Sequence, residues 1–176
     1  DRMPGDGRHR RVLDVGTGSG CMALAIQSER PGWEVVAMDL SEAALHQARA
    51  NAVQLGLEKV EWRLGDALAV DAWPSGPWDG IVSNPPYIPE SERLDAHVHD
   101  HEPSMALYVP DDRPLLFYQA LRSGAAQHLV PGGRMVAEGH RDLMQKVAEC
   151  WQLEGAQVDI LSDLQGAERG VRLIRH

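Results

Sequence analysis

Short apolar runs alternate with segments of helical periodicity along this chain, and the alternation constrains its fold more than any other feature. The predicted strands lie at residues 11–15, 33–39, 59–64, 78–83, 134–138, 157–161 and 170–175. The predicted helices lie at residues 19–29, 42–55, 114–128 and 141–153. This order predicts an α/β fold, with a doubly wound, mostly parallel sheet of seven strands and helices on both faces. The last two strands, with no helix-length linker between them, are expected to form an antiparallel pair.

Turn-forming residues mark the boundaries of several of these segments. Ser41 is suited to cap the start of the helix at 42–55, and Gly56 is suited to close it. Pro114 fits the first turn of the helix at 114–128. Pro131-Gly132-Gly133 predicts a tight turn into the strand at 134–138, and residues 84–112 are expected to form a long loop.

The composition of the 176 residues, 43% hydrophobic and 24% charged, fits one globular domain, residues 1–176. No apolar run is long enough to span a membrane and no signal peptide is visible, which predicts a cytoplasmic protein without a membrane partner. Cys21 and Cys150 make no disulfide framework. The net charge of −9 weighs against direct nucleic-acid binding, although a local basic patch could hide in that total. Because the chain begins with Asp1, we expect a fragment.

A glycine-rich turn follows the first strand, in the run Asp14-Val15-Gly16-Thr17-Gly18-Ser19-Gly20. Glycines let the backbone turn tightly and approach a ligand closely, and the following helix offers free N–H groups. The spacing is G-x-G-x-G, whereas a dinucleotide-binding turn would read G-x-G-x-x-G, so a nicotinamide cofactor is disfavoured. The alternative is a structural turn without a ligand.

Acidic residues end the next two strands. Asp39 follows Val35-Val36-Ala37-Met38, where a carboxylate can accept hydrogen bonds from both ribose hydroxyls of an adenosine. Asp66, in Gly65-Asp66-Ala67, can accept from an adenine amino group, while the backbone N–H of Ala67 can donate to a ring nitrogen. A helix cap or an ordinary strand-end turn would explain the same residues without a ligand.

Asn84-Pro85-Pro86-Tyr87 comes directly after the buried strand at 78–83. The Asn84 side-chain oxygen and the Pro85 carbonyl can accept the two hydrogens of a planar –NH2 group, whose nitrogen then attacks an electrophile. Pro86 stiffens the turn, and the Tyr87 ring can pack against a flat amide. A rigid surface turn is the alternative, because Asn-Pro and Pro-Pro are strong turn dipeptides.

Together these segments resemble the class I S-adenosylmethionine-dependent methyltransferases, and more narrowly the HemK-type release-factor glutamine methyltransferases. The narrower resemblance rests on Ser83-Asn84-Pro85-Pro86-Tyr87-Ile88-Pro89, His101-Glu102-Pro103-Ser104-Met105-Ala106-Leu107, Pro131-Gly132-Gly133 and Asp163-Leu164-Gln165-Gly166-Ala167-Glu168-Arg169. It implies methylation of the glutamine amide nitrogen in the Gly-Gly-Gln tip of peptide-chain release factors, with S-adenosylmethionine as cofactor and S-adenosylhomocysteine as product.

The resemblance also implies roles for individual residues. The implied cofactor-binding residues are Gly16, Thr17, Gly18, Ser19, Gly20, Asp39, Ala67 and Asn84, to which the chemistry above adds Asp66. The implied substrate-binding turn is Asn84, Pro85, Pro86 and Tyr87, with Asn84, Pro85 and Tyr87 as catalytic residues. Family members often carry a larger residue where this chain has Ala67, so Leu68 is a candidate for adenine stacking. The family's helical N-terminal domain and its Arg-Pro-Asp-Thr-Glu-like segment are not found before the first strand.

Other functions stay open at this point. A glutamine methyltransferase of a large-subunit ribosomal protein would share these motifs, and an amino-methyltransferase acting on DNA adenine or ribosomal RNA guanine would share the Asn-Pro-Pro-Tyr turn. A non-catalytic subunit that kept the fold is a further alternative. His97, His99 and His101 alternate beside Glu102, but we expect a polar lid there rather than a metal site.

Overall fold

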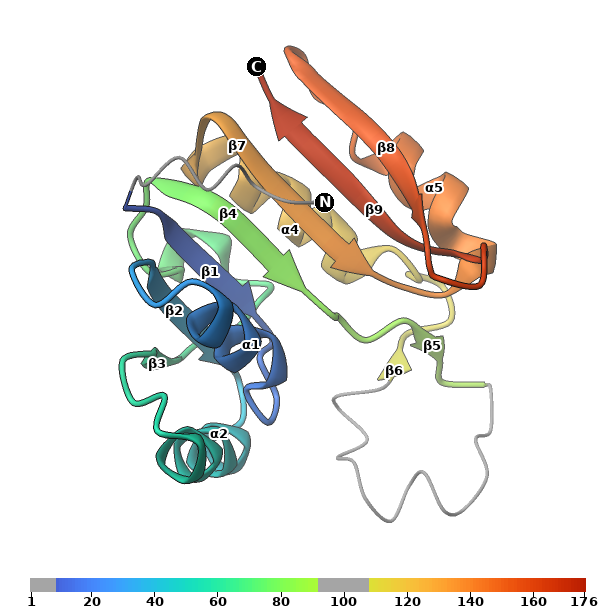
Figure 1. The fold of residues 1–176 in the computed structure, drawn as a ribbon. Coiled ribbons are helices and arrows are strands. Elements are labelled where there is room, and N and C mark those ends of the chain that lie inside the picture. The colour runs from blue at the N-terminus through green and yellow to red at the C-terminus, as the bar shows by residue number, and fades with distance from the viewer. Residues whose placement is uncertain (1–8, 92–107) are drawn as a thin grey trace.

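A seven-stranded sheet in the order β3-β2-β1-β4-β7-β9-β8 forms the centre of the protein (Figure 1). The computed structural model describes residues 9–91 and 108–176. The strands are β1 Arg11–Val15, β2 Glu34–Asp39, β3 Glu61–Leu64, β4 Trp78–Ser83, β7 Leu129–Glu138, β8 Ala156–Ser162 and β9 Glu168–Arg175. All neighbours pair in parallel except β9, which runs antiparallel to both β7 and β8. The predicted doubly wound sheet and its antiparallel last pair are therefore confirmed.

Helices cover both faces of this sheet. α1 (Cys21–Glu29) and α2 (Glu42–Leu55) lie on one face, and α4 (Leu116–His128) and α5 (Met144–Cys150) lie on the other (Figure 1). Alternating residues of β2 explain the arrangement: Val35 and Ala37 pack with α1 in one core, while Val36 and Met38 pack in the larger core that α4 and α5 share. The chain winds outward from β1 to β3 and then returns to β4, so the strand order reverses between β1 and β4. Ligands of such sheets bind at that switch point.

The predicted ends of α2 are confirmed. The Ser41 hydroxyl accepts a hydrogen bond from the Ala44 N–H at 3.2 Å, which satisfies a backbone donor that the first turn leaves unpaired. Gly56 closes the helix in the left-handed conformation, with φ of 66°.

Three of the predicted helices have wrong boundaries. α1 starts at Cys21 rather than at residue 19, because Gly18 and Gly20 hold the preceding turn at positive φ. α4 starts at Leu116, and Pro114 lies in the turn before it, where the Leu116 N–H donates to the Arg113 carbonyl at 3.1 Å. The helix predicted at 141–153 is a 3₁₀ turn, Arg141–Leu143, followed by the shorter α5.

Two further differences concern strands. Pro131-Gly132-Gly133 lies inside β7 as an irregularity, because Trp78 pairs with Leu129 while Gly80 already pairs with Arg134. Within the loop predicted at 84–112, two short parallel strands, β5 (Ile88–Pro89) and β6 (Tyr108–Val109), form a separate pair. A short 3₁₀ helix, Val70–Ala72, lies in the connection between β3 and β4.

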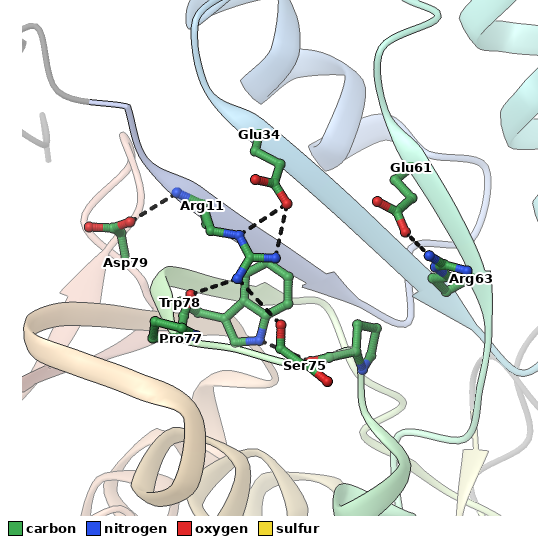
Figure 2. Close-up of polar contacts among 9 residues, drawn as sticks. Arg11, Glu34, Glu61, Arg63, Ser75, Pro77, Trp78 and Asp79 are labelled. Atoms are coloured by element: carbon green, nitrogen blue, oxygen red, sulfur yellow. Dashed lines mark hydrogen bonds and ion pairs between the residues drawn. The ribbon is translucent and has the colours of Figure 1, made fainter.

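Arg11 joins three segments at the amino ends of the central strands (Figure 2). Its guanidinium binds the Glu34 carboxylate at 2.9 Å and donates to the Pro77 carbonyl at 3.2 Å. It also lies over the fully buried Trp78 ring, 4.4 Å from the ring centre, a favourable contact for a cation. The Arg11 N–H donates to Asp79 at 2.9 Å. This network fixes β1 against β2 and β4 at their amino ends, opposite the turns that follow the carboxyl ends of these strands.

Candidate active site

The buried carboxylate of Asp14 anchors the glycine turn that follows β1. Asp14 is 0% exposed, and its Oδ2 accepts from the Thr17 hydroxyl at 2.7 Å and from the Ala23 N–H at 3.1 Å. The N–H groups of Gly16 and Thr17 donate to the Met38 carbonyl at 2.9 and 3.0 Å. One acidic side chain and one neighbouring strand thus hold both ends of the turn in place.

Positive φ angles at Gly16, Gly18 and Gly20, of 72°, 56° and 86°, explain why glycine occupies these positions. A Cβ added to Gly16 or Gly18 would meet nothing within 4 Å, so open space adjoins both. A Cβ added to Gly20 would lie 2.9 Å from the Trp62 ring. The first two glycines leave room for a ligand, whereas Gly20 leaves room for a side chain of β3.

Asp39 connects the end of β2 to the glycine turn. Its Oδ2 accepts from the Gly18 N–H and its Oδ1 from the Ser41 N–H, both at 2.8 Å. The carboxylate therefore lies beside the turn, where an adenosine ribose was predicted to bind. Each oxygen of a carboxylate has a second lone pair, so both can accept a further hydrogen bond.

The turn after β3 lies next to Asp39, because the Gly65 N–H donates to the Asp39 carbonyl at 2.9 Å. Asp66 accepts from the Leu68 N–H at 2.8 Å, and the Trp73 indole N–H donates to the Ala67 carbonyl at 3.1 Å. Leu68 is 40% exposed and Leu40, which follows Asp39, is 53% exposed. The sequence made Leu68 a candidate; Leu40 was not considered, although an apolar residue directly after Asp39 is visible in the sequence.

Asn84 lies at the carboxyl end of β4, the strand beside β1. The buried Ser83 hydroxyl donates to the Val15 carbonyl at 2.7 Å, and the same two residues are partners in the β1–β4 register. Asn84 is exposed and Pro85 is buried, while Tyr87 is partly buried against the larger core. The turns at 16–20, 39–41, 65–67 and 84–87 therefore follow the carboxyl ends of four adjacent parallel strands.

A cavity of about 450 Å³ opens at the carboxyl ends of β4 and β7, on the face of the sheet that carries α1. Met22, Val82 and Val136 contribute apolar walls, and Ser83 and Glu138 line it at the strand ends. Asp163 and Arg169 lie in the same wall, with their charged groups 3.9 Å apart. Asp163 also accepts from the N–H groups of residues 165 and 167, which shapes the turn between β8 and β9.

Burial raises the pKa of Asp14 to about 6. The hydrogen bonds from Thr17 and Ala23 lower it in part, and the charge of Asp39 raises it further. Its Oδ1 is buried and has no hydrogen-bond partner among the residues that the structure describes. From the sequence, no role was assigned to Asp14. An acidic residue between Leu13 and Val15 of an apolar strand was the feature that could have indicated one.

The alternating His97, His99 and His101, with Glu102, lie outside the described residues. Within residues 9–91 and 108–176, no group of three His, Cys, Asp or Glu side chains is placed to hold a metal ion. In the same ranges, no helix is both long and apolar enough to cross a membrane.

The fold and its four strand-end turns are those of a methyltransferase domain. The family model for the methyltransferase small domain matches residues 1–100, more than half of the chain, and the chain belongs to this family. The resemblance drawn from the glycine turn, Asp39 and Asn84 is thereby confirmed at the level of the family.

More particularly, the chain is similar to release factor glutamine methyltransferases. It is 42% identical over 171 residues to the protein of that name from Deinococcus radiodurans, covering 94% of this chain and 58% of that protein. It is 43% identical over 162 residues to the one from Cereibacter sphaeroides, covering 90% of this chain and 57% of that protein. The chain thus spans less than three fifths of the length of these curated relatives.

Solved structures share the fold. TrmN from Thermus thermophilus aligns with a TM-score of 0.68 and 25% identity, covering 95% of this chain and 44% of that one. A structure of PigF with SAH aligns with a TM-score of 0.62 and 18% identity, covering 98% of this chain and 52% of that one. Both alignments show that the arrangement of the sheet and its helices is shared with these solved structures.

Proposed function

We propose that this chain transfers a methyl group from S-adenosylmethionine to the side-chain amide nitrogen of a protein glutamine. The observation that carries the proposal is the position of Asn84-Pro85 at the end of β4, one strand away from the glycine turn. The bond between Ser83 and Val15 fixes that spacing at the switch point of the sheet. Two acceptors for an amide would then stand beside the site of the activated methyl group.

The residues around the turn fit the proposed cofactor. Open space adjoins Gly16 and Gly18, and the Asp39 carboxylate beside them has lone pairs left for ribose hydroxyls. Asp66 and the Ala67 backbone would face the adenine, and the exposed side chains of Leu40 and Leu68 offer apolar cover. When bound, S-adenosylmethionine supplies a methyl group already activated by its sulfonium.

The protein's own contribution would be positioning and electrostatics. An amide nitrogen is a weak nucleophile because its lone pair is delocalised into the carbonyl. The Asn84 side-chain oxygen and the Pro85 carbonyl would accept the two amide hydrogens and stabilise positive charge that develops on the nitrogen. The nitrogen gains a bond to the methyl carbon as the carbon–sulfur bond breaks, and one amide proton then leaves to water. Holding the reactants in this geometry is worth about 7–11 kcal/mol.

The proposed substrate is the Gly-Gly-Gln glutamine of a peptide-chain release factor. The names of relatives 42% and 43% identical to this chain support it, and so does the Asn-Pro-Pro-Tyr turn. A glutamine in a tight glycine-rich tip would present its amide to the exposed Asn84 with little steric hindrance. Cytoplasmic action follows, because release factors work on the ribosome.

A methyl-transfer assay with labelled cofactor tests this proposal. A release factor, a large-subunit ribosomal protein and a mixture of DNA and ribosomal RNA would be offered side by side. We expect label in the release factor, located on the glutamine by mass spectrometry and lost when that glutamine is replaced by glutamate. Label in the ribosomal protein or in nucleic acid, with none in the release factor, would assign one of the alternative substrates.

A further inference from the structure

Tyr118 of α4 is fixed at both ends beneath the carboxyl end of β7. The side chain is 0% exposed, and its hydroxyl donates to the Glu138 carbonyl at 3.1 Å. The Trp151 indole N–H donates to the Tyr118 carbonyl at 2.9 Å, and the two rings are tilted by 58° at 6.5 Å. A buried hydroxyl held in this way has little freedom to turn to another partner.

Gly139 leaves the space that the Tyr118 hydroxyl occupies. A Cβ at residue 139 would overlap that hydroxyl and would lie 2.6 Å from the Met144 Cε. The φ of Gly139 is not positive, so the backbone conformation does not itself require glycine. The Gly139 N–H donates to the Arg169 carbonyl at 3.1 Å, which ties the same point to β9. The absence of a side chain at residue 139 therefore makes room for the Tyr118 hydroxyl.

The point that Tyr118 fixes is next to the Asn-Pro-Pro-Tyr turn. In the parallel register Ala137 pairs with Ser83, so Glu138 and Asn84 leave the ends of neighbouring strands together. Tyr87 packs against the core cluster to which Tyr118 belongs. Burial raises the pKa of the Tyr118 hydroxyl, and the charges of Tyr87 and Glu138 raise it further.

We propose that Tyr118 is a positioning residue for methyl transfer, one that acts through the end of β7 and through Tyr87 on the turn that carries Asn84. The inference rests on the proposed function for its catalytic consequence. The Tyr118 hydroxyl holds the end of β7, and Tyr87 packs against the core cluster that contains the Tyr118 ring. Asn84 and Pro85 would thereby keep their two acceptors aimed at one point.

Tyr118→Phe tests the proposal, because it removes one oxygen and keeps the ring. We expect amide hydrogen exchange at Asn84, Tyr87, Ile88 and residues 138–140 to become about fivefold faster, the effect of losing one buried hydrogen bond. In the methyl-transfer assay, kcat should fall by a similar factor, while the dissociation constant of S-adenosylhomocysteine stays unchanged. A role limited to core stability would leave kcat of the folded enzyme unchanged.

Trp78→Phe is the matched control, since it alters a fully buried aromatic residue with its own indole hydrogen bond at the opposite edge of the sheet. Trp78→Phe should lower stability without a selective change in amide exchange at Asn84, Tyr87 and Ile88. Gly139→Ala should speed exchange at the same residues, and by less in the Tyr118→Phe background, where the overlapping oxygen is gone.

The outcomes separate this inference from the proposed function. Unchanged exchange at Asn84, Tyr87 and Ile88 in Tyr118→Phe would overturn the positioning role, whatever the activity. Faster exchange in that segment together with an unchanged kcat would also overturn it. A wild-type chain that methylates none of the offered substrates would defeat the proposed function, and the exchange measurements would still decide whether Tyr118 fixes the turn.

Discussion

The Asp39 carboxylate accepts a hydrogen bond from the Gly18 N–H at 2.8 Å, which joins the end of β2 to the glycine turn that follows β1. Its second oxygen accepts from the N–H of Ser41, the N-cap of α2. One side chain thus holds two segments that would both border the nucleoside. A ribose bound there would add its hydroxyls to a carboxylate that is already fixed, so little conformational freedom would be lost on binding.

Asp39→Ala is expected to weaken binding of S-adenosylhomocysteine by about 10- to 150-fold, because hydrogen bonds to a charged group contribute roughly 1.5–3 kcal/mol. Isothermal titration calorimetry measures the change. Glu34→Ala is the control, since Glu34 is also a carboxylate of β2 but binds Arg11 at the amino end of the strand. Equal affinities for wild type and Asp39→Ala would remove Asp39 from the cofactor site.

The fold was predictable where local pattern and tertiary packing agree. β1 and β4 begin and end at the predicted residues, because their apolar runs are buried between neighbouring strands and flanked by turn residues. Prediction failed where pairing with a distant segment of the chain determines the local structure. Pro131-Gly132-Gly133 is typical of a turn when considered alone, but pairing with β4 makes it an irregular part of β7. The pairing of Ile88–Pro89 with Tyr108–Val109 joins residues 20 apart, which no periodicity reveals.

The candidate site divides in the same way. Sequence indicated the strand-end turns, because a doubly wound sheet brings the carboxyl ends of its parallel strands to one edge. It could not indicate that Asp39 also supports Gly18, or that Tyr118 lies beneath the end of β7, since both contacts depend on how separate segments pack. The unpartnered oxygen of Asp14 is likewise a property of its burial rather than of its neighbours in sequence.

Asp14→Asn is expected to change how stability depends on pH. Since burial raises the folded pKa from 3.8 to about 6, the folded state binds the proton more tightly than the unfolded state. The free energy of unfolding therefore falls as pH rises from 3.8 to 6, by up to roughly 3 kcal/mol, and stays lower above that range. Asparagine cannot ionise, so the variant does not show this loss. Its free energy of unfolding should therefore rise relative to that of wild type as pH increases from 4 to 7.

Urea unfolding at several pH values measures that difference directly, because the other titrating groups cancel between the two proteins. Asp71→Asn, at an exposed carboxylate of the 3₁₀ helix, is the matched control for the substitution itself. If the stability difference between Asp14→Asn and wild type stays constant from pH 4 to 7, the pKa of Asp14 is not raised by folding.

Gly20→Ala is expected to cost more stability than Gly56→Ala. Both glycines have positive φ, of 86° and 66°, so each substitution should cost about 1–2 kcal/mol for the left-handed backbone. Only at Gly20 would the new Cβ also lie 2.9 Å from the Trp62 ring, whereas at Gly56 it would meet nothing within 4 Å. Equal losses in denaturant unfolding would show that the ring moves aside freely. Trp62→Leu should relieve part of the additional loss at Gly20, where the Ala48 Cβ would still lie 3.1 Å away, and leave the loss at Gly56 unchanged.

Asn84→Ala separates chemistry from binding in the proposed reaction. Because Asn84 is exposed and follows the last residue of β4, its replacement should leave the thermal midpoint of unfolding unchanged. The loss of one acceptor for the glutamine amide should lower kcat by about 10²-fold, the effect of removing one preorganised polar group from a transition state. The affinity for S-adenosylhomocysteine should change by much less, since Asp39 and the glycine turn would still hold the cofactor. Wild-type turnover in Asn84→Ala would show that the amide is held by other groups, and a parallel loss of affinity and rate would place Asn84 in cofactor binding instead.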